Sequence, residues 1–115
     1  MAIFKGAGVA IVTPMKANGD VNFEKFQELI EFQIKEGVDC IVVCGTTGEA
    51  STLTEDEHIE CIRVAAARAK KASRKLPVIA GTGSNDTATA VYLSKEAKKA
   101  GADAIIIHGR TRQEF

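Results

Sequence analysis

Short apolar runs alternate with longer segments of helical periodicity along the chain. Four runs are nearly continuous in apolar residues and are set apart by roughly thirty residues, the length of a strand–helix–strand unit. Such runs are typical of strands buried on both faces of a parallel sheet. The three segments between them carry apolar residues at helical spacing and one polar face. The pattern predicts a parallel sheet with right-handed helical crossovers, with strands at residues 7–14, 38–44, 77–81 and 102–107.

Capping residues mark the ends of the predicted helices. Asn22 is a candidate N-cap, and Gly37 stands where a glycine favours the C-terminus of the first helix. Thr54 and Glu57 have the spacing of a capping box, in which each side chain bonds the backbone amide of the other residue. Gly101 closes the third helical segment. These signals predict helices that begin after Asn22 and Thr54 and end before Gly37 and Gly101.

The segment Gly45-Thr46-Thr47-Gly48-Glu49 follows the second predicted strand. Its glycines let the backbone approach a ligand closely, and its threonines offer hydroxyl and amide donors to a carboxylate or a phosphate. The same residues also fit an ordinary strand-to-helix turn with a glycine at each end. The alternation fits either a doubly wound open sheet or part of a (β/α)8 barrel, and both folds place ligand loops at the carboxyl ends of the strands.

The composition narrows the classes of function. The chain has 115 residues, which allows one domain, and its 15 basic residues balance 15 acidic ones, so we expect no attraction to nucleic acid or to an anionic membrane. Its apolar runs are too short to span a bilayer and its N-terminus lacks a signal-peptide pattern, so a cytoplasmic location is expected. Three cysteines argue against a disulfide framework, and we expect buried thiols. With two histidines and no CxxC motif, we expect no metal site.

Three motifs in order resemble the dihydrodipicolinate synthase family. They are Gly8-Val9-Ala10-Ile11-Val12-Thr13-Pro14-Met15, Gly45-Thr46-Thr47-Gly48-Glu49 and Pro77-Val78-Ile79-Ala80-Gly81-Thr82-Gly83. The wider group is the pyruvate-dependent class I aldolases, which includes the N-acetylneuraminate lyases, and the pattern favours the synthases. The resemblance covers residues 3 to about 106 and implies a (β/α)8 barrel.

The resemblance also implies a reaction. In this family pyruvate forms a Schiff base with a lysine late in the barrel, and the resulting enamine attacks aspartate semialdehyde in lysine biosynthesis. No further cofactor is implied. On this mapping Thr46, Thr47 and Gly48 bind the pyruvate carboxylate. Thr46 would also relay protons between two tyrosines, one of them from a neighbouring subunit. Glu49 would support the loop by hydrogen bonding.

Bacterial members of the family often bind lysine as an inhibitor at a dimer interface. His58 and Asn85 fall on positions that resemble this pocket, whereas Thr89 stands where an acidic residue is often found. The alternative for His58 is a solvated position on the second helix.

We expect residues 1–107 to form half of such a barrel, namely about three βα units and a fourth strand, followed by a divergent tail at 108–115. A complete barrel takes about 250 residues, so we expect the Schiff-base lysine and the relay tyrosine to lie outside this chain. We therefore expect no catalysis by the chain alone. A half-barrel exposes sheet edges, which favour self-association, and a homo-oligomer is expected.

The tail begins His108-Gly109-Arg110-Thr111-Arg112. It is similar to a stretch of the dihydrouridine synthases that helps to hold the FMN phosphate, and Arg110 and Arg112 are candidate phosphate ligands. A frayed end, or a shortened version of the family's own loop, explains the same residues. Three hypotheses therefore remain: the N-terminal half of a synthase-like lyase, a self-associating half-barrel of natural or engineered origin, and a phosphate or flavin binder.

Overall fold

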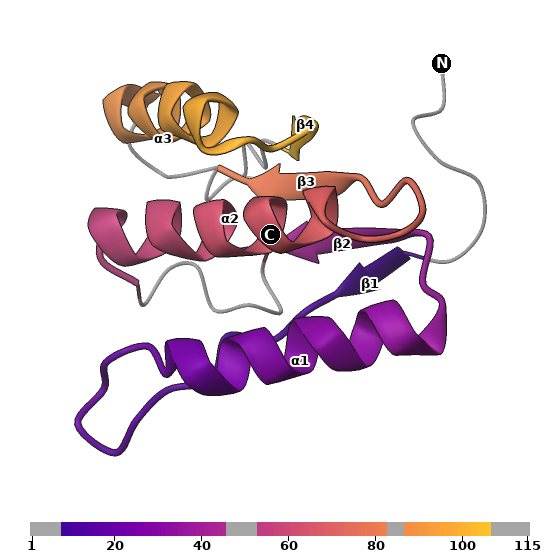
Figure 1. The fold of residues 1–115 in the computed structure, drawn as a ribbon. Coiled ribbons are helices and arrows are strands. Elements are labelled where there is room, and N and C mark those ends of the chain that lie inside the picture. Colours follow the sequence, from indigo (N-terminus) through magenta and orange to yellow (C-terminus); the bar gives the residue numbers. More distant parts are fainter. Residues whose placement is uncertain (1–7, 46–52, 83–86, 107–115) are drawn as a thin grey trace, which may run out of the picture.

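The fold is a four-stranded parallel sheet with a layer of helices (Figure 1). The computed structural model describes residues 8–45, 53–82 and 87–106. Strands and helices alternate through these residues, as the apolar pattern predicts. The elements are β1 (Gly8–Ala10), α1 (Phe23–Glu36), β2 (Cys40–Val43), α2 (Glu55–Lys70), β3 (Val78–Gly81), α3 (Thr87–Ala100) and β4 (Ala104–Ile106).

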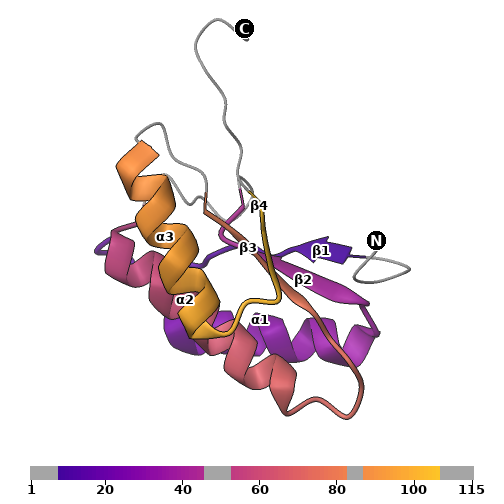
Figure 2. The same ribbon diagram turned by 90° about the horizontal axis from the view of Figure 1, so that it is seen from above.

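The strand order distinguishes the two candidate architectures. The strands are paired in sequence order, β1-β2-β3-β4, and all three pairings are parallel. With right-handed crossovers, an order without reversal puts every helix on the same face of the sheet, and Figure 2 shows α1, α2 and α3 together on one side. A doubly wound sheet reverses its order and carries helices on both faces. The arrangement is therefore that of a (β/α) barrel segment.

The core lies between the sheet and the three helices. Phe26 and Ile30 of α1, Ile62 of α2, and Ile41 and Val78 of the central strands are fully buried. At about 25 cal/mol per Å² of apolar surface, burial of such side chains is the main stabilising contribution to a domain of this size. The core thus joins α1 and α2 to the central strands β2 and β3.

The observed ends of α1 confirm the predicted caps. The Asn22 side chain accepts a hydrogen bond from the Lys25 amide at 3.0 Å. Gly37 is left-handed, with φ 86°, and its amide donates to the Ile34 carbonyl at 3.2 Å. A left-handed residue at this position satisfies helix carbonyls that lack an intrahelical donor.

The strands are shorter than the apolar runs that predicted them. β1 covers three residues of the run at 7–14, because the chain leaves the sheet to form an antiparallel bridge between Met15 and Val21. β2 ends at Val43, one residue before the end of the predicted strand. The shortening places the start of each loop at a defined residue.

Candidate functional site

The predicted ligand loop begins at the carboxyl end of β2, beside the carboxyl end of β3. Cys44 and Gly45 form its described beginning, and Leu53 and Thr54 form its described end. Of the predicted site residues, only His58 lies within the described residues. The others, in the segments 46–52, 83–86 and 107–115, lie outside them, namely Thr46, Thr47, Gly48, Glu49, Asn85, Arg110 and Arg112.

Cys44 turns the chain out of the sheet in a left-handed conformation. Its φ is +60°, the single positive value for a non-glycine residue in the described part of the chain. This conformation is uncommon for residues with a side chain, so the surrounding contacts must hold it. The Cys44 thiol is buried and donates to the His58 carbonyl, with Sγ and O 3.7 Å apart.

The thiols of Cys44 and Cys61 act as packing groups. A hydrogen bond with the Cys61 thiol, together with burial, raises the pKa of Cys44 far above its ordinary value. A thiol that stays protonated is a poor nucleophile. Cys40, Cys44 and Cys61 are all free and buried, which confirms the expectation of buried thiols.

Gly81, the last residue of β3, packs directly against the beginning of the loop. A Cβ atom at Gly81 would stand 2.5 Å from the Cys44 carbonyl oxygen and 3.1 Å from the Gly45 Cα. No real side chain tolerates the first of these distances, because both neighbours are backbone. The close approach of the two strand ends therefore requires glycine at this position.

His58 is buried, which makes its alternative interpretation as a solvated helix residue wrong. Only 3% of His58 is exposed, and its Nε2 lies 2.6 Å from the Gly81 carbonyl oxygen. The tautomer that carries its proton on Nε2 donates this hydrogen bond. Burial lowers the pKa of His58, and the hydrogen bond to Gly81 opposes that shift. The lowered pKa favours the neutral ring. The place of His58 in a lysine pocket with Asn85 stays a prediction.

The sequence held a signal for this burial. His58 lies on the same face of α2 as Cys61 and Ile62, three and four residues further on, and both of these are fully buried. A histidine in register with an apolar helix face indicates a buried ring with a fixed partner. Its partner, the Gly81 carbonyl, lies 23 residues away and carries no side-chain signal.

The end of the loop is fixed by the predicted capping box. The Glu57 amide donates to Thr54 Oγ1 at 3.1 Å, and the Thr54 amide donates to Glu57 Oε1 at 3.0 Å. The Val21 amide donates to the other carboxylate oxygen, Oε2, at 3.3 Å. Backbone hydrogen bonds from Thr54 and Val21 lower the pKa of Glu57. Both ends of the loop are thus anchored to the same helix, one through Cys44 and His58 and the other through Thr54.

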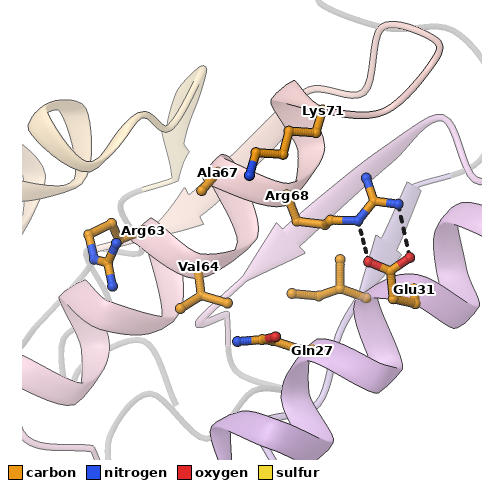
Figure 3. A pocket seen from close by; sticks show the side chains of 8 residues that line it. Gln27, Glu31, Arg63, Val64, Ala67, Arg68 and Lys71 are labelled. Carbon is orange, nitrogen blue, oxygen red and sulfur yellow. Dashed lines mark hydrogen bonds and ion pairs between the residues drawn. The ribbon is translucent and has the colours of Figure 1, made fainter.

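A separate groove of about 280 Å³ lies between α1 and α2 (Figure 3). Arg68 and Glu31 pair across it, with one of the two hydrogen bonds, Nη2 to Oε1, at 2.9 Å. Gln27, Val64 and Lys71 are among the other residues that line it. His58, the predicted site residue within the described part of the chain, does not line this groove, and the Arg68 guanidinium is already paired with a carboxylate.

The described segments contain no group of three or more His, Cys, Asp or Glu side chains placed to hold a metal ion. None of the helices within these segments combines the length and apolarity that a bilayer crossing needs.

The strand order and the position of the loop define a segment of a parallel (β/α) barrel. The chain belongs to the Dihydrodipicolinate synthetase family, whose sequence model matches residues 3–108. This match confirms the family resemblance of the three motifs.

The relatives agree on family and fold. The chain is 66% identical over 107 residues to the 4-hydroxy-tetrahydrodipicolinate synthase of Lachnoclostridium phytofermentans, covering 93% of this chain and 35% of the relative. The crystal structure of dihydrodipicolinate synthase from Aquifex aeolicus superimposes with a TM-score of 0.83 at 43% identity, over 96% of this chain and 38% of that one. The crystal structure of the chloride-inhibited dihydrodipicolinate synthase of Acinetobacter baumannii, complexed with pyruvate, superimposes with a TM-score of 0.82 at 43% identity. The match covers 95% of this chain and 38% of that one. The chain thus spans about a third of the length of the relatives that it matches.

Proposed function

We propose that this chain supplies the pyruvate-binding loop of a dihydrodipicolinate synthase-type lyase. One observation carries the proposal: the Gly45–Glu49 motif follows β2 in a chain that is 66% identical to a 4-hydroxy-tetrahydrodipicolinate synthase. A solved neighbour of 43% identity is a complex with pyruvate. The reaction is the condensation of pyruvate with aspartate semialdehyde, which belongs to lysine biosynthesis, and the proposed location is the cytoplasm.

The proposed roles follow from the chemistry of a glycine-flanked pair of hydroxyls. Thr46, Thr47 and Gly48 bind the pyruvate carboxylate through amide and hydroxyl donors. Thr46 also passes a proton between tyrosines, because a hydroxyl both donates and accepts without becoming charged. Glu49 supports the loop by hydrogen bonding. We further propose that the Schiff-base lysine lies outside residues 1–115, so that these residues alone do not catalyse the condensation.

Borohydride trapping tests the position of the lysine. The 115-residue chain is incubated with pyruvate and borohydride, alone and together with the remaining C-terminal part of the L. phytofermentans relative, and intact masses are measured. We expect a reduced pyruvate adduct on the added part and none on this chain. An adduct on this chain would show that one of its own lysines forms the Schiff base.

Two variants at Thr46 test the role of the loop in the same mixture. Thr46→Val removes the hydroxyl at nearly constant shape, and we expect the condensation rate to fall about a hundredfold, the lower end for loss of a proton-transfer group. Thr46→Ser keeps the hydroxyl and is the matched control. Equal rates for the two variants would remove the relay role.

We propose self-association as a second function that the chain can have by itself. The observation that favours it is apolar exposure at the two edge strands: Val12, just beyond β1, is 48% exposed, and Ile105 and Ile106 of β4 are 39% and 42% exposed. Edges with unpaired backbone groups and apolar side chains favour pairing with another chain. The expected product is a homo-oligomer in which a second copy covers these edges.

A further inference from the structure

Three residues that are distant in sequence meet in one largely buried cluster at the beginning of the loop. Cys44 follows β2, His58 belongs to the first half of α2, and Gly81 ends β3. Cys44 and His58 are 2% and 3% exposed, and each touches the others through a polar or backbone contact. We call these residues the His58 cluster.

We propose that His58 is a positioning residue that fixes the Cys44–Gly45 peptide, from which the predicted pyruvate-binding motif follows, through the Gly81 carbonyl. The inference rests on the proposed function, because it assigns the loop a ligand whose binding depends on its orientation. His58 itself touches neither substrate nor reacting atoms in this proposal.

The first step runs from His58 to Gly81. The ring nitrogen Nε2 and the Gly81 oxygen are 2.6 Å apart in a part-buried setting, where a hydrogen bond is stronger than in water and a lost partner is costly. The bond fixes the orientation of the last peptide of β3. Without it, the Gly81 carbonyl would have to turn toward another donor.

The second step runs from Gly81 to the loop. The Gly81 Cα faces the Cys44 carbonyl and the Gly45 Cα so closely that no Cβ fits between them. Any rotation of the Gly81 peptide therefore displaces the Cys44–Gly45 peptide. Cys44 occupies a small left-handed region of conformational space, so this peptide has few alternative orientations. The amide of Thr46 comes directly after it.

The third step is the consequence for a ligand. Donors that bind a carboxylate must be held within a few tenths of an ångström, and displacement by about 1 Å can cost about a hundredfold in rate. The His58 cluster holds one end of the loop, and the capping box of Thr54 and Glu57 holds the other. His58 sits one helical turn beyond Thr54, so the two anchors share the first turns of α2.

Variants at His58 test the proposal in the 115-residue chain. His58→Leu fills the space without a donor, His58→Gln keeps an N–H donor at similar reach, and His58→Asn keeps a donor that is too short. Ile62→Val, on the next turn of α2, is the control for a buried change on the same helix face that leaves the donor of His58 in place. Amide hydrogen exchange at Cys44, Gly45, Thr46 and Thr47 is measured by NMR, normalised to exchange in the core of β3, with and without pyruvate.

We expect His58→Leu and His58→Asn to speed normalised exchange at these four amides about tenfold or more, whereas His58→Gln and Ile62→Val stay close to the wild-type chain. Equal exchange in His58→Gln and His58→Asn would overturn the proposal, since the position of the donor would then be irrelevant. Should His58→Leu fail to fold, this Gln and Asn pair still decides.

The pyruvate arm separates the two proposals. Both proposals are supported if pyruvate shifts the NMR signals of the Thr46 and Thr47 amides and if His58→Asn lowers the affinity for pyruvate about tenfold. His58→Gln should restore that affinity. If the His58 variants speed exchange at these amides but pyruvate does not shift the amide signals of the wild-type chain, the positioning role is supported and the proposed ligand is contradicted. Unchanged exchange with a lowered melting temperature in His58→Asn makes His58 merely structural and overturns the inference.

Discussion

At the scale of single residues, two glycines at neighbouring strand ends have different requirements. Gly81 has no room for a Cβ because the Cys44 carbonyl oxygen would be 2.5 Å away. A Cβ at Gly45 would make one ordinary contact, 3.5 Å from the Val42 Cγ1 atom. The packing requirement for glycine therefore lies at the end of β3, although the sequence motif draws attention to the glycines of the loop.

This difference predicts opposite tolerance to alanine. Gly81→Ala should lower the free energy of unfolding by about 1–3 kcal/mol, because backbone must shift to accept the methyl group. Gly45→Ala is the matched control, and it should change the free energy of unfolding by less than about 1 kcal/mol. Urea unfolding followed by circular dichroism measures both. Equal losses would mean that the beginning of the loop moves freely away from β3.

The sequence predicts the local features of the site and misses those that join distant segments. The position of Thr46 and Thr47 after a strand follows from the apolar run that precedes them. The burial of His58 was not predicted, although its register with Ile62 indicates it, and its partner is a backbone carbonyl, which no side-chain pattern marks. The left-handed Cys44 carries no signal either, because cysteine has no preference for that conformation.

At the scale of elements, the ends of the helices are the best predicted features. Asn22, Gly37 and the box of Thr54 and Glu57 act through residues at most a few positions apart, so the sequence contains the whole interaction. The Arg74 guanidinium also caps α1, donating to the Ile34 carbonyl at 3.2 Å. This contact spans 40 positions, and it could not be predicted before the packing of α1 beside α2 was known.

The capping box gives a prediction for α2. Thr54→Ala removes the acceptor for the Glu57 amide and should lower the free energy of unfolding by about 1 kcal/mol. Ser73→Ala, at an exposed position beyond the other end of the same helix, should change it by less than about 0.5 kcal/mol. Thermal unfolding of both variants measures the difference. A Thr54→Ala chain as stable as the Ser73→Ala chain would show that the helix needs no cap.

At the scale of the whole molecule, the sheet has two edge strands that differ from its interior. Residues 78–80 of β3 are buried on both sides of the sheet, whereas Ile105 and Ile106 of β4 are exposed. The sequence predicts all four strands equally, as apolar runs of similar kind. It does not indicate which strand becomes an edge, because that depends on the neighbours that each strand finds.

The edges predict the behaviour of the chain in solution. Sedimentation at micromolar concentration should show a homo-oligomer, and Ile106→Lys should shift it toward the monomer, because a charge on an edge strand opposes pairing. Phe32→Lys is the matched control, since Phe32 is 55% exposed and belongs to a helix, α1, rather than to a strand. A monomeric wild-type chain, or equal effects of the two lysines, would contradict pairing through β4.

The sequential strand order also has a consequence for how the chain is made. Every strand pairs with the one that precedes it along the chain, so each new helix and strand can add to a surface that already exists. This order of addition suits a polypeptide that leaves the ribosome from its N-terminus. During synthesis the strand made last would form the edge of the sheet to which the next strand pairs. In the structure β4 is the strand at this edge.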